Sequence, residues 1–98
     1  MRAMEPKARK LADLAGLGPA TIEDLKQLGV TSVGQLARCE AEELWGRLCA
    51  IKGCRVDPCC QDVFSAAIAH ARNPDLEPAK RRWWYWSGVR KARAKPTR

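Results

Sequence analysis

Signals that end or begin helices recur along this chain at short intervals, and no other feature of the sequence constrains the fold as much. The signals are Gly16-Leu17-Gly18-Pro19, Gly29, Gly53, Asp57-Pro58 and Asn73-Pro74. Between them, apolar residues recur with the spacing of a helix, and no segment alternates as a half-buried strand would. The sequence therefore predicts an all-α domain of about five short helices. We expect these helices at residues 6–15, 19–28, a short stretch beginning at Ser32, 41–50 and 58–72.

The positive charge of the chain is concentrated at one end. The 98 residues carry a formal net charge of +7, from 18 Lys and Arg against 11 Asp and Glu. Residues 1–78 hold 10 basic and 11 acidic side chains, whereas residues 79–98 hold eight basic side chains and no acidic one. We therefore expect a helical domain at 1–78, a tryptophan-rich segment packed on it at 79–87, and a flexible basic tail at 88–98.

Neither a membrane span nor a secretion signal is evident in the sequence. No apolar run approaches the ~20 residues that a spanning helix needs, and the N-terminal stretch MRAMEPKARK contains no signal-peptide core. We expect a soluble, cytoplasmic protein that makes no membrane contact.

No catalytic constellation stands out. The only histidine, His70, follows Cys59 on the same expected helix, and the two are roughly 16 Å apart along its axis. That separation is too large for a nucleophile and its base. The segment from Gly16 to Thr21 lacks the Lys-Ser/Thr ending of a nucleotide-binding loop. We predict no enzyme activity and no cofactor.

The five cysteines raise the question of a metal site. They lie at positions 39, 49, 54, 59 and 60. Structural zinc sites usually show closely spaced cysteine pairs in sharp turns, and Cys49 and Cys60 instead fall on apolar helical faces. We therefore expect free thiols and no metal, with a zinc-stabilised module as a weaker alternative. A reactive thiol at Cys59 is a further alternative, because a helix N-terminus would lower its pKa.

The turn Gly16-Leu17-Gly18-Pro19 carries the strongest functional signal. A helix that starts after such a turn points unpaired backbone N–H groups and its positive dipole end outward, which suits a phosphate. Leu17 would fold inward, and the glycines would let a sugar-phosphate backbone approach. We expect the phosphate at Gly16, Leu17, Gly18, Pro19, Ala20 and Thr21, with Lys26 as a nearby charge.

The pattern from Leu11 to Leu25 resembles the helix-hairpin-helix motif of DNA repair proteins, h-x-x-h-x-G-h-G-x-x-x-A-x-x-h, where h is apolar. Ile22 stands where that motif usually has alanine. Residues Leu48-x-x-Ile51-Lys52-Gly53 look like a degenerate second copy, in which Lys52 and Arg55 would act as point charges. The resemblance implies a paired helix-hairpin-helix (SAM-like) bundle whose second hairpin is mainly structural.

A closer resemblance covers residues 11–87. The blocks LAGLGPATIEDLKQLGVTSVGQL, EELWGRLCAIKG, DPCCQDVFSAAI and WWYW are similar, in that order, to small helix-hairpin-helix proteins known as pathogenicity-locus or mitomycin-resistance proteins. The resemblance implies the helical fold and an expectation of DNA binding. The family label describes a phenotype and names no reaction.

The segment Lys80-Arg81-Arg82-Trp83-Trp84-Tyr85-Trp86 places three basic residues beside four aromatic ones. It would suit a nucleic-acid surface, with cations on phosphates and rings on unpaired bases. A small core also needs large rings. We expect Trp83 and Trp86 to be the buried pair and Trp84 and Tyr85 to be more exposed.

These observations favour a non-catalytic protein that binds the DNA backbone without sequence preference, in DNA repair or resistance to DNA damage. The alternative is a protein-interaction module that docks onto a repair or recombination factor, which the nearly neutral charge of residues 1–78 favours.

Overall fold

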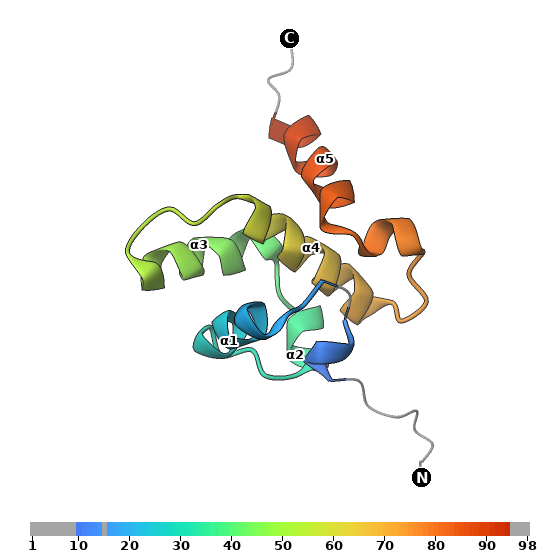
Figure 1. Cartoon of the computed structure of the whole chain (residues 1–98), viewed down its shortest axis with the longest axis horizontal. Helices are drawn as coiled ribbons and strands as arrows, with labels where there is room; N and C mark the ends of the chain where they lie inside the picture. Colours follow the sequence, from blue (N-terminus) through green and yellow to red (C-terminus); the bar gives the residue numbers. More distant parts are fainter. Residues whose placement is uncertain (1–9, 15, 95–98) are drawn as a thin grey trace.

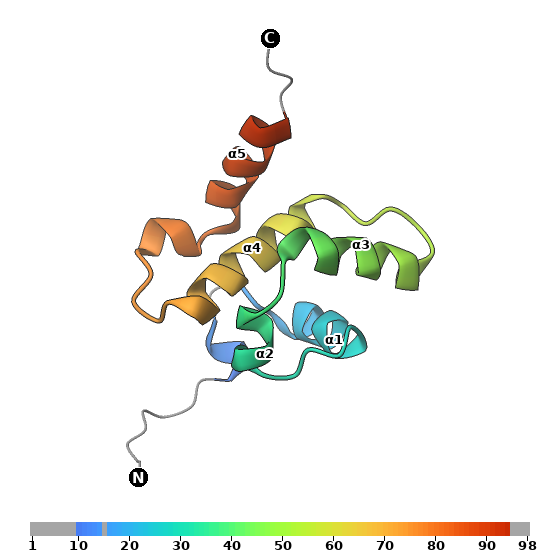
Figure 2. The same cartoon turned by 180° about the vertical axis from the view of Figure 1, so that it is seen from behind.

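The computed structural model of this protein describes residues 10–14 and 16–94, and within them all regular structure is helical. Helix α4 lies at the centre, with α2 and α3 packed against it and with α5 on its far side (Figure 1). The view from behind shows the same central position of α4 (Figure 2). The elements are η1 (Leu11–Asp13), α1 (Pro19–Gln27), α2 (Val33–Ala37), α3 (Ala41–Lys52), α4 (Cys59–Arg72), η2 (Pro78–Arg81) and α5 (Trp83–Ala94).

Four of the expected helices are confirmed, because their ends are set by local chemistry. Ser32 begins α2 as its N-cap, and its Oγ accepts a hydrogen bond from the backbone N–H of Gln35 at 3.2 Å. The Gln35 side chain reaches back to the N–H of Thr31 at 2.7 Å. Gly53 ends α3 in the left-handed conformation, with φ of 72°, a geometry that glycine adopts without a steric penalty.

The helix expected at 6–15 is wrong within the described residues. Only the single 3-10 turn η1 forms, and the backbone is extended at Lys10 before it and at Leu14 after it. Asp13 closes this turn by accepting the N–H of Lys10 at 2.8 Å. Leu14, where the backbone is extended, and Leu17, after the turn, both have buried side chains. Residues 6–9 and Ala15 lie outside the described residues.

The core is built from one apolar residue or more of every element up to α4. The most deeply buried side chains include Leu25, Leu36, Leu44, Leu48 and Phe64. Burial of a leucine or phenylalanine side chain contributes about 1.5–3 kcal/mol. Alanines at 66, 67 and 71 are also buried, which lets neighbouring helices approach α4 closely.

Arg72, at the end of α4, joins that helix to the end of α2. Its Nε donates to the carbonyl oxygen of Ala37 at 2.7 Å, and its Nη2 donates to that of Cys39 at 3.0 Å. Glu40 lies 3.7 Å from the same guanidinium. One side chain therefore satisfies the last carbonyl group of α2, at Ala37, and that of Cys39 in the connection that follows.

The C-terminal part differs from the expectation of a flexible tail over 88–98. Helix α5 continues through Ala94 and packs along α4, and residues 95–98 lie outside the described residues. Arg90 reaches Asp62 of α4, a partner 28 residues away that local patterning does not reveal.

The expectation for the aromatic block is partly wrong. Trp86 is half-buried and its Nε1 donates to the carbonyl oxygen of Lys80 at 2.7 Å. Trp83, expected to be buried with it, is 37% exposed, although it precedes Trp86 and Ser87 by three and four residues and so lies on the same side of α5. Trp84 and Tyr85 are exposed, as predicted. Among the described helices, none combines the length and apolar character needed to cross a membrane.

Candidate functional site

The glycine turn precedes α1 and has the inward leucine that the sequence predicts. Gly16 has φ of +79°, a conformation that L side chains rarely adopt. Leu17 is buried, and its N–H donates to Leu14 O at 3.4 Å. Gly18 is the N-cap of α1, with φ of −89° and ψ of 176°. The turn is therefore held to the core by Leu17, while both glycines are exposed.

The surface outside the two glycines is open. A Cβ atom built on either Gly16 or Gly18 would meet nothing within 4 Å. At Gly16 the backbone conformation alone accounts for glycine. At Gly18 neither the conformation nor the space requires it, since an extended residue with room around it suits many side chains.

No side chain caps the N-terminus of α1 within the described part of the chain. Gly18 has no side chain to offer, and Pro19 occupies the first helical position without an N–H group. Ala20 is exposed and Thr21 is half-buried. The structure thus brings together the residues predicted around the turn, Gly16 to Thr21, on one end of α1.

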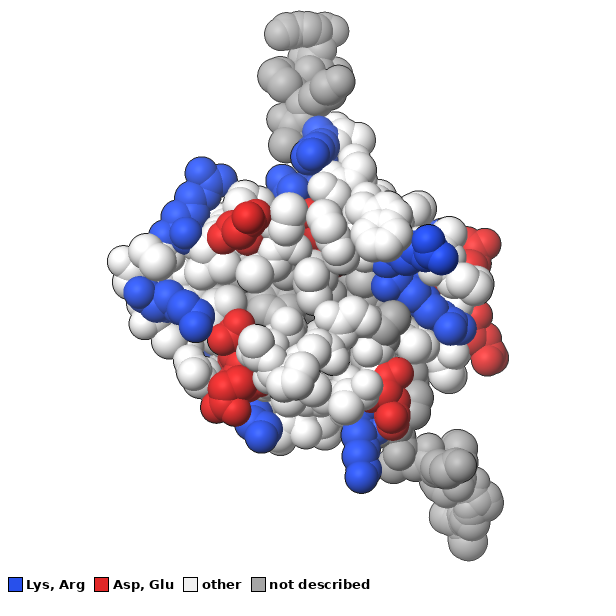
Figure 3. All heavy atoms as spheres, viewed as in Figure 1, with Lys and Arg blue, Asp and Glu red and all other residues white. Residues whose placement is uncertain are grey.

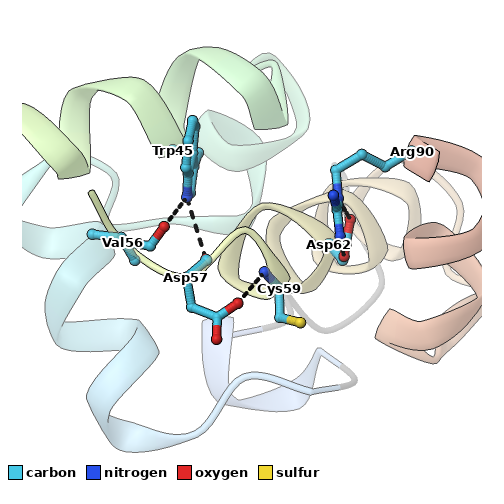
Figure 4. A network of polar contacts seen from close by, with 6 residues as sticks. All are labelled: Trp45, Val56, Asp57, Cys59, Asp62 and Arg90. Carbon is cyan, nitrogen blue, oxygen red and sulfur yellow. Dashed lines mark hydrogen bonds and ion pairs between the residues drawn. The ribbon is translucent and has the colours of Figure 1, made fainter. Parts of the chain in front are cut away.

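The second hairpin, α3 to α4, has a different N-terminus. Asp57 Oδ1 accepts the backbone N–H of Cys59 at 2.9 Å, and the hydrogen bond lowers the pKa of this carboxyl. The N–H of Cys60 donates to Asp57 O. Trp45 Nε1 holds the same loop through Val56 O at 3.2 Å and Asp57 O at 3.3 Å (Figure 4). A carboxylate of the protein itself therefore occupies the position that an anion would take at α4.

The basic residues predicted near the two hairpins have different surroundings. Lys52 Nζ lies 3.2 Å from Asp24 Oδ1, which links α3 to α1 and neutralises the lysine. The Arg55 guanidinium lies 5.9 Å from the centre of the Trp45 ring. Lys26 is exposed and forms no ion pair with any described residue.

The basic residues of η2 and its following turn lie elsewhere. Lys80 pairs with Glu77 at 3.6 Å, and Arg81 Nε donates to Leu76 O at 2.7 Å. The Arg82 guanidinium lies 5.5 Å from the centre of the Trp84 ring. Figure 1 places η2 and α1 on opposite sides of α4. The predicted contact residues therefore form two groups and not one continuous patch.

Charges of both signs are interspersed over the visible face of the body (Figure 3). This matches the small net charge of residues 1–78. A groove of about 770 Å³ between α3, α4 and α5 has Glu40, Glu42 and Glu43 on one wall and Trp86 on another. Arg72 and Arg90 also line the groove, but they are paired with Glu40 and Asp62. The carboxylates therefore make the groove a poor place for a phosphate.

The cysteines do not gather into a ligand set. No group of three or more Cys, His, Asp or Glu side chains suited to a metal lies within the described residues. All five cysteines are free, and Cys54 is exposed. Desolvation, with a hydrogen bond to Asp57, raises the pKa of the Cys59 thiol. The lowered pKa expected at this helix N-terminus is therefore wrong, because desolvation of the thiol and then the hydrogen bond and charge of Asp57 raise the pKa.

The buried ion pair between Asp62 and Arg90 was not foreseen from the sequence. Asp62 is 1% exposed. Arg90 donates a hydrogen bond to each of its carboxylate oxygens, at 2.9 and 3.0 Å (Figure 4). The hydrogen bond to Asp62 raises the pKa of Arg90. One sequence feature could have indicated that a helix packs beside Asp62. Ala66 lies one turn along α4 from Asp62, and its small side chain leaves room for a second helix.

Comparison with known proteins places this sequence in a family. The model of the pathogenicity locus family matches residues 4–92. The chain is similar to the mitomycin resistance protein McrB of Streptomyces lavendulae, with 30% identity over 81 residues, which are 83% of this chain and 73% of that protein. No solved structure gives a significant match. Since the family match spans nearly the whole described helical region, this chain belongs to the pathogenicity locus family.

Proposed function

We propose that this protein is a non-catalytic DNA-binding protein that holds the phosphate backbone at the turn from Gly16 to Thr21, through the glycine turn of a helix-hairpin-helix motif whose first helix is reduced to the 3-10 turn η1 in the described residues. The difference between its two helix N-termini carries the proposal. Asp57 occupies the N-terminus of α4, whereas α1 begins at an exposed glycine with no side-chain cap. Glycine at position 18 is not needed by the fold, and close approach of an external group would explain it.

Phosphate binding at this turn follows from elementary electrostatics. The N–H groups of the first turn and the positive end of the α1 dipole favour an anion. Ala20 leaves the approach unobstructed, and the Thr21 hydroxyl adds a donor. Lys26, two turns along α1, supplies a charge that no acidic residue neutralises among the described residues. Contacts of this kind read no base edges, so binding is independent of sequence.

The sharpest test is Gly18→Asp in the full chain. Aspartate is a good N-cap, so this variant should keep or slightly raise the stability of α1, by a few tenths of a kcal/mol. Its carboxylate would occupy the same N–H groups and repel a phosphate. We expect at least about tenfold weaker binding to a short duplex in fluorescence anisotropy, equivalent to about 1.4 kcal/mol.

The control is Gly46→Asp, which adds the same charge at an exposed, open position of α3. It should change duplex affinity much less than Gly18→Asp. Binding of the unmodified protein should weaken steeply with salt, because each neutralised phosphate releases about 0.9 counterions. Equal affinities for the two aspartate variants would reject the turn as the contact.

A role in resistance to mitomycin accompanies this proposal, because the similar Streptomyces protein is named for that resistance. A strain that lacks the gene should be more sensitive to mitomycin. Complementation with Gly46→Asp should restore resistance, and complementation with Gly18→Asp should not. Full rescue by both variants would separate resistance from phosphate binding.

The second candidate function is docking onto a repair or recombination protein. The mixed charges of the body favour it, because residues 1–78 carry a net charge of only −1. A full chain that shows no salt-dependent DNA binding and copurifies with one partner would support this function over the first.

A further inference from the structure

Three consecutive aromatic side chains at the start of α5 project into solvent. Trp83, Trp84 and Tyr85 are 37%, 55% and 39% exposed. The next ring, Trp86, is half-buried and hydrogen-bonded to Lys80. The fold therefore uses one ring of the block for packing and leaves the other three partly exposed. Tryptophan and tyrosine in such positions are typical of contact surfaces.

The outward side of α5 continues this surface. Gly88 and Lys91 are exposed, and they follow Trp84 by four and seven residues, so the three lie along one side of the helix. A Cβ at Gly88 would meet nothing within 4 Å. In this row of residues, no large side chain therefore lies between Trp84 and Lys91.

Cations flank the exposed rings at both ends. The Arg82 guanidinium lies 5.5 Å from the centre of the Trp84 ring, and Lys91 lies about 10 Å along the axis from Trp84. Residues 79–98 contain eight Lys and Arg and no acidic residue. Arg90 is engaged with Asp62, but Arg82 and Lys91 are exposed.

Exposed rings flanked by cations match a ligand that carries both aromatic groups and negative charges. Nucleic acid has this chemistry, and its bases offer their faces only when they are unpaired. We infer that the outward side of α5, with Trp84, Tyr85 and Lys91, and Arg82 just before the helix together stack unpaired bases of single-stranded DNA and hold its phosphates. This inference rests on the proposed DNA binding and names its substrate class: DNA that contains unpaired bases.

The test compares a short oligothymidine with a blunt duplex of equal length, each bound to the full chain in fluorescence anisotropy. Trp84→Ala should weaken oligothymidine binding roughly 5- to 100-fold, which corresponds to about 1–3 kcal/mol for one stacked base. Duplex affinity should change by less than about twofold, since paired bases expose no face on which the Trp84 ring could stack. Trp84→Phe keeps a ring and should recover most of the lost affinity.

Ile51→Ala is the control, because Ile51 is a large exposed apolar residue on α3. It should leave oligothymidine affinity unchanged. Arg82→Gln should reduce the slope of log affinity against log salt by about 0.7 for the single strand, whereas Trp84→Ala should leave that slope unchanged. The indole N–H resonance of Trp84 should shift on addition of oligothymidine, and that of Trp45, which is bonded to Val56 O, should not.

The outcomes for this surface and for the glycine turn are distinguishable. If Gly18→Asp weakens duplex binding and Trp84→Ala leaves oligothymidine binding intact, the stacking surface is refuted and the proposed function stands. If Trp84→Ala weakens oligothymidine binding and Gly18→Asp changes the affinity for neither ligand, only the phosphate site at the glycine turn is refuted. If Trp84→Ala abolishes binding to anionic vesicles and leaves oligothymidine affinity unchanged, the rings contact a lipid surface and the inference is overturned.

Discussion

The pair formed by Asp62 and Arg90 makes the folded domain depend on a residue near the C-terminal end of the chain. Arg90→Ala would leave the Asp62 carboxylate, which is 1% exposed, without the two hydrogen bonds at 2.9 and 3.0 Å. A carboxylate that deeply buried is poorly hydrated, so its charge would have no compensation in the folded state.

The magnitude follows from the burial of each partner. Removal of one member of a buried ion pair costs about 3–5 kcal/mol. The Arg90 side chain is 26% exposed, so water enters part of the space that it vacates and reduces the loss. We expect a destabilisation of about 2–3 kcal/mol, which for a domain of this size lowers the melting temperature by roughly 10–20 °C.

The assay is urea and thermal unfolding followed by far-ultraviolet circular dichroism. Lys91→Ala is the control, because the adjacent lysine is exposed, and it should change stability by less than about 0.5 kcal/mol. In Asp62→Leu with Arg90→Met both charges are absent, and this double variant should be more stable than Arg90→Ala alone. An Arg90→Ala variant as stable as Lys91→Ala would refute the reasoning, because α5 would then not bury the carboxylate.

Three smaller predictions concern caps and thiols. Ser32→Ala should destabilise the protein by about 1 kcal/mol in urea unfolding, because Gln35 loses the acceptor for its N–H. The carboxyl resonance of Asp57 should titrate below the ordinary pKa of an aspartate. The stability contributed by the Asp57 carboxylate is therefore present above the ordinary aspartate pKa. It is lost as the pH falls through the lower folded-state pKa, and Asp57→Asn should remove this pH dependence. With a thiol reagent at neutral pH, Cys54, which is exposed, should react before Cys59, whose pKa is raised, and Asp57→Asn should speed the reaction of Cys59. Equal rates for the two thiols would contradict the last prediction.

The parts of the fold that the sequence predicts are those governed by neighbouring residues. Ser32 starts α2 and Gly53 ends α3 through contacts within one turn of the chain. The inward position of Leu17 follows in the same way from the apolar spacing around the glycines.

The parts that sequence reasoning misses depend on residues far apart in the chain. Nothing beside Arg90 indicates that its partner is Asp62, and without that contact the basic segment resembles a solvated tail. The extended backbone at Leu14 depends likewise on tertiary packing, because Leu11, Leu14 and Leu17 are all buried in one core cluster. By contrast, the Asp57-Pro58 pair predicts a capped start of α4 from local sequence alone, and Asp57 Oδ1 accepts the N–H of Cys59 there.

The bonds from Arg72 to Ala37 and Cys39 have a consequence for the order in which the protein folds. Helix α2 has five residues, too few to persist in water without tertiary support. The carbonyl group of its last residue, Ala37, is bonded by a guanidinium that is in place only when the last turn of α4 has formed. The amide protons of α2 should therefore acquire protection from hydrogen exchange no earlier than those at the end of α4, even though α2 precedes α4 in the chain.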